Sequence, residues 1–379
     1  MERQIVHCDL DTFFVSVERL LNSSLNDKPV LIGGSGDRAV VASCSYEARQ
    51  FGVHSAMPMR LARQLCPEAV LVRGDFDRYS QYSDTVTEII SEAAPLVEKA
   101  SIDEHYIDLT GMDRFFGCWQ WTRELRQRII KETGLPISFG LSTNKTVSKI
   151  ATGEAKPSGE RQVGWGSERA FLAPLSIRRI PMIGEKTYTQ LRNLGISKVG
   201  TLQQVPVRTM QKVLGKNGVT IWKKANGIDD SPVTAHAERK SISKEHTFER
   251  DTIDLAQLRR VIHGMADELA FDLRRDGRLA RCLTLKIRYS NFDTHTVQAR
   301  LPCTASERVM TENALELFAK LYSRRMLIRL VGVKLSDLVH GHQQTDLFED
   351  SATDLALTQA MDRMRNRFGE KAVVWGAGF

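Results

Sequence analysis

Residues 100–108 read Ala-Ser-Ile-Asp-Glu-His-Tyr-Ile-Asp, and residues 5–11 read Ile-Val-His-Cys-Asp-Leu-Asp. Both are short, mostly apolar runs typical of buried β-strands, yet they carry the acids Asp9, Asp103 and Glu104. Ionised carboxylates are costly to bury unless a counter-charge neutralises them. A pair of Mg²⁺ ions about 4 Å apart would do so, and such a pair also serves phosphoryl and nucleotidyl transfer. Taken singly, each acid could instead be an ordinary turn residue, helix cap or solvated surface residue without a metal-binding role.

The charge distribution favours a polyanionic partner. The chain has 379 residues, which predicts two to four domains, and 53 Lys and Arg against 46 Asp and Glu give a net charge of +7. Residues 165–230 alone hold eleven Lys or Arg and four Asp or Glu. Such concentrated positive charge is typical of nucleic-acid binding, although a solvated helical face would give the same count.

The cysteine pattern and the N-terminus predict a cytoplasmic location. The six cysteines have neither C-x-x-C nor zinc-ligand spacing, so we expect free thiols in a reducing compartment. The N-terminus runs into a strand without the pattern of a signal peptide. No apolar run approaches the roughly 18 residues of a membrane span, so no membrane association is expected.

Strand-like and helix-like segments alternate, which predicts an α/β (α+β) architecture. Strands are expected at residues 4–10, 30–34, 39–43, 99–107 and 135–141, and helices at 14–21, 45–51, 78–94, 119–133 and 144–155. Short helices follow from about residue 165. The segment 240–340 then combines expected helices at 255–275 and 306–322 with strands at 283–289, 296–301 and 328–335.

The acid-bearing segments 5–11 and 100–108, and further segments along nearly the whole chain, resemble motifs of the Y-family translesion DNA polymerases in the same order. The resemblance is greatest to the bacterial DNA polymerase IV branch. The resemblance implies that Asp9, Asp103, Glu104 and the backbone carbonyl of Leu10 bind two Mg²⁺ ions. Asp11, two residues after Asp9, is a secondary candidate because alternate residues of a strand share a face.

The segment around the first strand resembles the nucleotide-binding part of the family. The resemblance places Phe13 and Phe14 at the incoming nucleotide, with Phe14 as the steric gate, a flat ring that leaves no room for a 2′-hydroxyl. Both are also candidates for the core. The remaining residues that the resemblance assigns to the incoming nucleotide are Tyr46, Arg49 and Lys156 for its phosphates and Val40 and Ala42 for the roof above the base pair.

Two further segments resemble DNA-binding parts. Residues 180–186 resemble a helix-hairpin-helix, with Gly184, Lys186 and Arg192 in its basic context and Met182 where the motif commonly has a Gly. Such hairpins direct backbone N–H groups at a DNA phosphate. The segment that begins at Lys240 and Ser241 resembles the start of a little-finger domain.

Residues 344–348, Gln-Thr-Asp-Leu-Phe, resemble the peptide with which bacterial polymerases dock on the β subunit of the sliding clamp. Leu347 and Phe348 would fill an apolar pocket and Gln344 would bond at its rim. An ordinary polar tail is the alternative. His105 departs from the small or apolar residue expected after the Asp-Glu pair, and filling space is its expected role.

The sequence therefore predicts a right-hand polymerase that acts as a monomer on primer–template DNA and deoxynucleoside triphosphates. The predicted domains are a palm (1–10 and 75–164), small fingers (11–74), a helical thumb (165–230), a linker (231–239), a little finger (240–340) and a tail with the clamp peptide (341–379). A catalytically silent DNA-binding scaffold and a nucleotide cyclase are the alternatives. The three retained acids argue against the first, and the expected DNA grip argues against the second.

Overall fold

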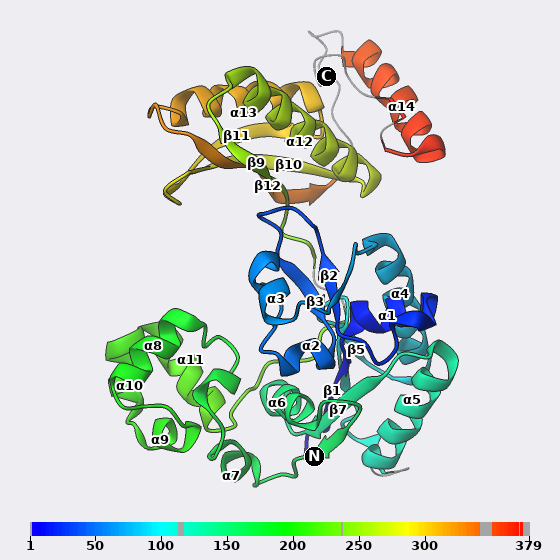
Figure 1. Cartoon of the computed structure of the whole chain (residues 1–379), viewed down its shortest axis with the longest axis vertical. Helices are drawn as coiled ribbons and strands as arrows, with labels where there is room; N and C mark the ends of the chain where they lie inside the picture. Colours follow the sequence, from blue (N-terminus) through cyan, green and yellow to red (C-terminus); the bar gives the residue numbers. More distant parts are fainter. Residues whose placement is uncertain (1, 113–116, 236–237, 342–350, 371, 374–379) are drawn as a thin grey trace. The chain divides into compact units, whose positions relative to one another are not determined.

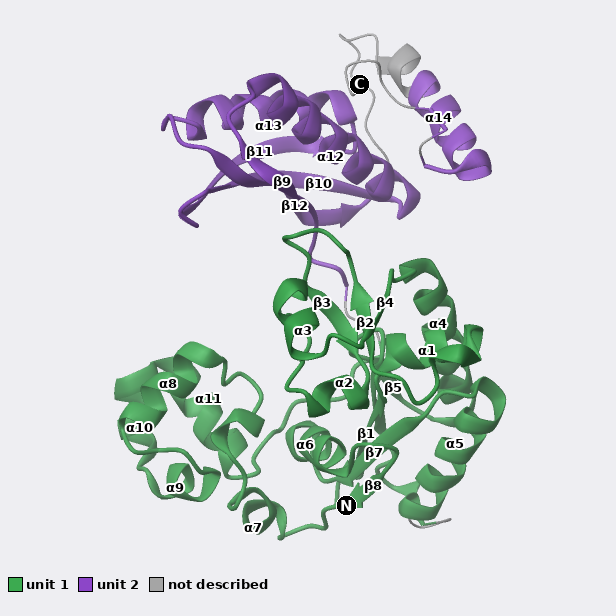
Figure 2. Cartoon of the chain, in the orientation of Figure 1, with its two compact units in different colours: residues 1–237 green, residues 238–379 purple. Residues whose placement is uncertain are grey.

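The computed structural model describes residues 2–112, 117–235, 238–341, 351–370 and 372–373. The chain forms two compact units, residues 1–237 and residues 238–379 (Figure 2). The clamp-like peptide, with Gln344, Leu347 and Phe348, lies outside the described residues. Each unit is described by itself below.

The first unit is built on a five-stranded sheet in the order β5-β6-β1-β7-β8 (Figure 1). Its strands are β5 (Val97–Lys99), β6 (Glu104–Asp108), β1 (Ile5–Leu10), β7 (Ile137–Ser142) and β8 (Glu160–Gln162). The helices around it are α1 (Phe13–Leu21), η1 (Ser23–Leu25), α4 (Phe76–Ala93), α5 (Cys118–Thr133) and α6 (Lys145–Ala155). The helix α6 covers one face of the sheet, and α4 and α5 cover the other (Figure 1).

Strand alternation decides which residues of β1 meet which helix. Val6, Cys8 and Leu10 join the apolar core beneath α4 and α5, so His7 and Asp9 point to the α6 face. The strands β1 and β6 are antiparallel, and Asp9 pairs with Glu104 in their register. Both acids therefore lie on the face that α6 covers.

The helix α6 lies unusually close to the sheet at Gly140 of β7. A Cβ atom at this glycine would stand 2.3 Å from the Ser148 carbonyl oxygen and 2.6 Å from the Thr152 nitrogen, so no larger residue fits without moving the helix. This contact fixes the height of α6 above the acids.

A single strand was predicted over residues 99–107, and that prediction is wrong. The structure has two antiparallel strands, β5 and β6, joined by a turn at residues 100–103. The backbone N–H groups of Ala100 and Ser101 both donate to the Glu104 carbonyl, at 2.9 and 3.3 Å. Asp103 consequently lies in the turn that precedes β6, not within a strand.

Two smaller groups of elements complete the first unit. A three-stranded sheet, ordered β3-β2-β4, packs with two short helices on its own apolar cluster; these elements are β2 (Val30–Gly33), β3 (Val41–Cys44), β4 (Val70–Val72), α2 (Tyr46–Gln50) and α3 (Met59–Leu65). A bundle of short helices packs on an apolar cluster that also includes Val147, Ile150 and Ala151 of α6. Its elements are α7 (Glu168–Leu172), η3 (Ile177–Arg179), α8 (Glu185–Asn193), α9 (Val199–Gln204), α10 (Val207–Leu214) and α11 (Lys216–Ala225).

The second unit is a four-stranded antiparallel sheet, ordered β11-β10-β12-β9, with helices packed on one face (Figure 1). Its elements are β9 (Ser241–Thr252), α12 (Leu255–Arg275), β10 (Arg278–Tyr289), β11 (Thr294–Thr304), α13 (Glu307–Leu321), β12 (Ile328–His340) and α14 (Ser351–Phe368). The helix α14 is held by ion pairs from Asp362 to Arg274 (2.7 Å) and from Arg365 to Asp267 (2.7 Å).

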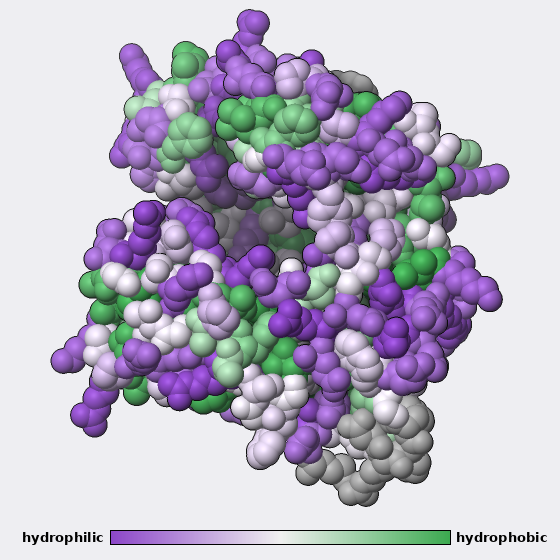
Figure 3. Space-filling view, turned by 60° about the horizontal axis from the view of Figure 1, so that its bottom comes forward, coloured by the Kyte–Doolittle hydropathy of each residue, from purple (hydrophilic) through white to green (hydrophobic). Residues whose placement is uncertain are grey.

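Polar side chains dominate the face shown in Figure 3, where apolar patches are small and scattered. Among the residues that the structure describes, no helix has the length and apolar character needed to cross a membrane.

Candidate active site

The three predicted acids meet at the end of β1. Asp9 is the register partner of Glu104, and the backbone N–H of Leu10 donates to the Asp103 carbonyl at 3.0 Å. That hydrogen bond fixes the turn that carries Asp103 beside the last residue of β1. The Asp103 carboxylate accepts a hydrogen bond from the Ser101 hydroxyl at 2.6 Å, which orients it further.

Two lysines from the α6 region contact two of these acids. The Lys156 ammonium, directly after α6, contacts Asp9 Oδ1, and the Lys149 ammonium contacts Glu104 Oε1. The pKa of Asp9 is raised to about 7, mainly by burial and also by the nearby Glu104 and Asp103, while Lys156 opposes the shift. Burial also acts to raise the pKa of Glu104, but His7 and Lys149 outweigh it and the pKa falls to about 2. Carboxylates this close to one another gain from added positive charge.

Asp9 and Glu104 line a cavity of about 590 Å³. Five residues that the sequence assigned to metal or nucleotide line it together, namely Asp9, Tyr46, Arg49, Glu104 and Lys156. Its other wall consists of residues 178–183, which include the first four residues, 180–183, of the predicted hairpin. Asp103 and Phe14 are not among the lining residues.

The donor chemistry of the three predicted acids fits a hard divalent cation. Asp9, Asp103 and Glu104 offer only carboxylate oxygens, which Mg²⁺ prefers over nitrogen or sulfur. Within the described ranges, no three His, Cys, Asp or Glu side chains are arranged to enclose an ion, and ammonium groups hold Asp9 and Glu104 instead.

Asp11, the secondary candidate for a metal ligand, supports its neighbours. Its side chain is buried and accepts hydrogen bonds from the Tyr46 hydroxyl (3.0 Å), the Ser138 hydroxyl (2.8 Å) and the Ser158 backbone N–H (2.8 Å). The chain turns at Thr12, whose φ of 42° is left-handed. Asp11 thus joins α2, β7 and the loop after α6.

The remaining nucleotide-binding candidates divide by burial. Phe13 is buried in the core, whereas Phe14 is half-buried and stacks on Tyr79. Val40 and Ala42 are exposed. The Arg49 guanidinium lies 4.9 Å from the Tyr46 ring centroid, which places the two predicted phosphate contacts side by side.

Sequence reasoning missed His7 and Lys149. His7 Nδ1 lies 2.9 Å from the Thr152 hydroxyl, and its Nε2 lies 3.9 Å from Glu104 Oε1, too far for a hydrogen bond. The signals were present, because His7 alternates with Asp9 along β1, and Lys149 precedes Lys156 by two helical turns. His105 sits on the opposite sheet face, where it is buried and its Nε2 lies 2.9 Å from the Thr87 hydroxyl.

The predicted DNA-binding residues are on the surface. Gly184 caps the N-terminus of α8, and Lys186 and Arg192 are exposed on that helix. Met182 adopts a φ of 77°, the left-handed conformation that glycine favours. The turn of the hairpin is therefore formed despite the substitution. In the second unit, Lys240 is exposed and Ser241 begins β9.

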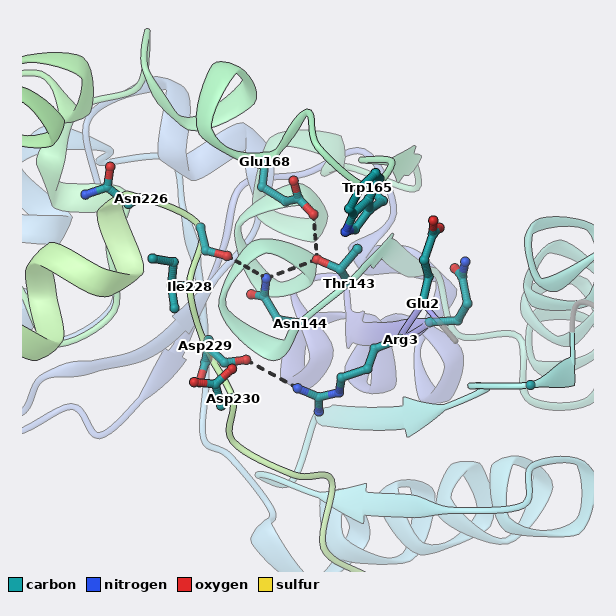
Figure 4. A pocket seen from close by; sticks show the side chains of 13 residues that line it. Glu2, Arg3, Thr143, Asn144, Trp165, Glu168, Asn226, Ile228, Asp229 and Asp230 are labelled. Atoms are coloured by element: carbon teal, nitrogen blue, oxygen red, sulfur yellow. Dashed lines mark hydrogen bonds between the residues drawn. The ribbon is translucent and has the colours of Figure 1, made fainter.

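A second cavity of about 950 Å³ opens at the start of β1 (Figure 4). Trp165, which is 73% exposed, and the acids Glu168, Asp229 and Asp230 line it together with Arg3. Glu168 accepts a hydrogen bond from the Thr143 hydroxyl at 2.7 Å. None of the predicted site residues lines this cavity.

Family models match most of the chain. The impB/mucB/samB family matches residues 8–153, its C-terminal domain matches residues 239–347, and the thumb domain of DNA polymerase-iota matches residues 178–229. The second of these matches spans most of the second unit, and the first includes Asp9, Asp103 and Glu104.

Curated relatives and a solved structure extend this match to the full length. A DNA polymerase IV of Dehalococcoides mccartyi is 39% identical and covers 99% of this chain and 97% of its own. A DNA polymerase IV of Halorhodospira halophila is 38% identical and covers 91% and 98%. The Y-family DNA polymerase chimera Dbh-Dpo4(243-245)-Dbh superposes with a TM-score of 0.81 at 25% identity, covering 89% of this chain and 100% of its own. The chain therefore belongs to the Y-family of translesion DNA polymerases, in the DNA polymerase IV branch, and is a DNA-directed DNA polymerase.

Proposed function

We propose that the 590 Å³ cavity is where a primer 3′-hydroxyl attacks the α-phosphate of a deoxynucleoside triphosphate, with pyrophosphate leaving. The observation that carries this proposal is that Asp9 and Glu104 share the cavity with Tyr46, Arg49 and Lys156. Acids beside phosphate-binding groups are what nucleotidyl transfer needs.

The family depends on divalent metal, and we assign the ion here to Mg²⁺, held by Asp9, Asp103, Glu104 and the Leu10 carbonyl. When bound, a pair of such ions supplies charge neutralisation and activation of the attacking hydroxyl. The chain's own residues orient the triphosphate. Arg49 offers a planar fork of donors and Lys156 offers a point charge to the β and γ phosphates. The same contacts stabilise negative charge on the departing pyrophosphate.

The neighbouring residues would set selectivity. Phe14 would exclude the 2′-hydroxyl of a ribonucleotide by clash. Val40 and Ala42 present small exposed side chains, which support a roomy roof, low fidelity and bypass of damaged templates. We assign palm, fingers, thumb and little finger to the predicted ranges, with Gly184, Lys186, Arg192, Lys240 and Ser241 facing the DNA.

The tail, the assembly state and the location complete the proposal. We assign residues 344–348 to the sliding clamp, the working form to a monomer, and the location to the bacterial cytoplasm. The free cysteines of the described chain support a reducing compartment.

Primer extension with Mg²⁺ and all four deoxynucleotides tests the proposal. Wild type should extend a primed template, and Asp103→Ala should not, while both bind the DNA equally by fluorescence anisotropy. Extension by Asp103→Ala at the wild-type rate would overturn the assignment of the acids. No extension by either, with DNA binding retained, would favour the silent scaffold.

A further inference from the structure

Two ion pairs in the cavity join the phosphate-binding side to the metal-binding side. Lys156 contacts Asp9 with side chains 22% and 16% exposed, and Lys149 contacts Glu104 with side chains 35% and 22% exposed. Partial burial makes such pairs stronger than pairs on an open surface, because water and salt screen them less. Each pair occupies a carboxylate oxygen that a divalent cation would also use.

Lys156 lies where metal ligands and phosphate ligands meet. Its ammonium contacts Asp9 and is 3.9 Å from Asp11 Oδ1, the same oxygen that accepts the Tyr46 hydroxyl. Arg49 stacks over the Tyr46 ring. One ammonium group therefore has an acid on one side and the predicted triphosphate contacts on the other.

A cation and the Lys156 ammonium cannot both hold Asp9 at low cost. They repel each other, and they compete for the same carboxylate. A triphosphate bound beside Tyr46 and Arg49 would give Lys156 a new anionic partner and release Asp9. The cation could then bind Asp9 without leaving the Lys156 ammonium unpaired.

We propose that Lys156 is a positioning residue that couples the two ligands: it holds Asp9 until a nucleotide arrives and then transfers to the phosphates, so that metal and nucleotide bind cooperatively. Lys149 holds Glu104 in the same way but lacks the contact with the Asp11–Tyr46 pair. This inference rests on the proposed function, since it takes Asp9 as a metal ligand. By linkage, the nucleotide must raise metal affinity by the same factor as the metal raises nucleotide affinity.

Binding measurements without DNA test this coupling, because no turnover can then occur. The probe is Mn²⁺, followed by the electron paramagnetic resonance signal of the free ion. The full chain is titrated with and without an α,β-imido deoxynucleoside triphosphate. Chelation by the free analogue is measured without protein and subtracted.

The variants separate the specific contact from general charge. Lys156→Met removes the ammonium, Lys156→Gln repeats the test with a polar side chain in case the first variant misfolds, and Lys156→Arg restores a cation. Arg49→Met removes a charge from the same cavity without touching an acid. Each variant is checked for a wild-type unfolding temperature.

Wild type should bind Mn²⁺ about tenfold tighter with the analogue than without it, within the usual range of coupling between sites. Lys156→Met and Lys156→Gln should bind Mn²⁺ tighter than wild type in the absence of the analogue. The analogue should then increase their Mn²⁺ affinity much less than it does in wild type. Lys156→Arg should behave as wild type, and Arg49→Met should leave Mn²⁺ affinity without the analogue nearly unchanged.

Two outcomes overturn the proposal. One is an unchanged or weaker Mn²⁺ affinity of both neutral Lys156 variants without the analogue. The other is an increase in Mn²⁺ affinity without the analogue that is as large in Arg49→Met as in the neutral Lys156 variants. The effect would then come from the general positive charge of the cavity and not from the Lys156 contact. If wild type binds no Mn²⁺ even with the analogue, the metal assignment in the proposed function fails as well, so the two failures are distinguishable.

Discussion

The ring of Phe14 lies flat on the ring of Tyr79, with centroids 4.3 Å apart and planes 14° from parallel. Tyr79 is buried, and its hydroxyl donates to Glu18 Oε1 at 2.6 Å. The half-exposed Phe14 is therefore backed by a ring that α4 and α1 hold in place. A steric gate needs such rigid support, because a ring that can move aside excludes nothing.

Loss of the gate or of its support should relax sugar selection to different degrees. Phe14→Ala is expected to lower the preference for deoxynucleotides by about a hundredfold, and Tyr79→Leu by about tenfold, as for loss of one well-packed contact. The measurement is the ratio of kcat/KM for dCTP and CTP. Tyr79→Phe keeps the stacking and serves as the control. Unchanged discrimination in Phe14→Ala would sink the gate assignment.

Removal of the Asp11 carboxylate should destabilise the site without removing a proposed metal ligand. Asp11→Ala leaves the Tyr46, Ser138 and Ser158 donors unpaired, and each buried unpaired donor costs about 1–3 kcal/mol. We expect a lower unfolding temperature and a higher KM for nucleotide, with Asp11→Asn closer to wild type. A stable Asp11→Ala with a lost kcat would instead make Asp11 a ligand.

Glycine should relieve the hairpin turn at Met182. A left-handed conformation costs an L-residue about 1–2 kcal/mol, and Met182 is 53% exposed, so little packing is lost on its removal. Met182→Gly should therefore raise the thermal unfolding temperature of the helical bundle. Met182→Ala keeps the backbone cost and is the matched control. A lower unfolding temperature for the Gly variant than for the Ala variant would contradict this account.

The ion pair between Arg365 and Asp267 should hold α14 on the second unit. Arg365 is 3% exposed, and its guanidinium donates to both oxygens of Asp267, at 3.1 and 2.7 Å. Arg365→Met should cost about 3–5 kcal/mol, because it leaves a buried carboxylate unpaired. Limited proteolysis in the C-terminal region should accelerate accordingly. The double variant Arg365→Met with Asp267→Leu should recover much of the loss, and a double variant as labile as the single one would contradict the pair's role.

Asp229 should contribute stability that acid removes. Burial acts to raise its pKa, but Ser231, Thr146 and Lys224 outweigh it and lower the pKa from 3.8 to about 2. A depressed folded-state pKa gives stability that is full above the unfolded value and is lost as pH falls through the folded value. The difference in unfolding free energy between wild type and Asp229→Asn should thus be constant above about pH 4 and shrink toward pH 2.

The exposed neighbour Asp230 provides the comparison for that experiment (Figure 4). Asp230→Asn removes an exposed carboxylate from the adjacent position and controls for the general loss of one negative charge. A difference for Asp229→Asn that grows as pH falls would have the wrong sign and would refute the assigned cause.

The sequence allowed short apolar strands around Asp9 and Glu104 to be predicted, but neither the pairing of these strands nor the turn beside them. Buried apolar runs around Asp9 and Glu104 have the length of neighbouring strands, and the register places the two opposite each other. Ile102 extends the apolar pattern and led to one strand over 99–107. The Ser101 hydroxyl instead bonds to Asp103, and such local side-chain bonds compete with strand pairing.

The other features that the sequence did not predict depend on contacts between residues far apart in the chain. Asp11 meets Ser138 and Ser158, and Arg365 meets Asp267, at separations that no local pattern reveals. At Met182, by contrast, the local sequence argued against a tight turn, because a residue other than glycine disfavours the left-handed conformation. Packing of the hairpin between Ile180 and Ile183, both buried, outweighed that preference.

The pairing of β1 with strands and a helix encoded far downstream also bears on synthesis at the ribosome. Asp9 is translated early, but Glu104 can pair with it only once β6 has emerged, and Lys156 can contact it only once residues up to 156 have emerged. A nascent or prematurely released chain that ends before α6 therefore carries acids but no assembled centre. Incomplete copies of a damage-tolerant polymerase would be inert toward the chromosome.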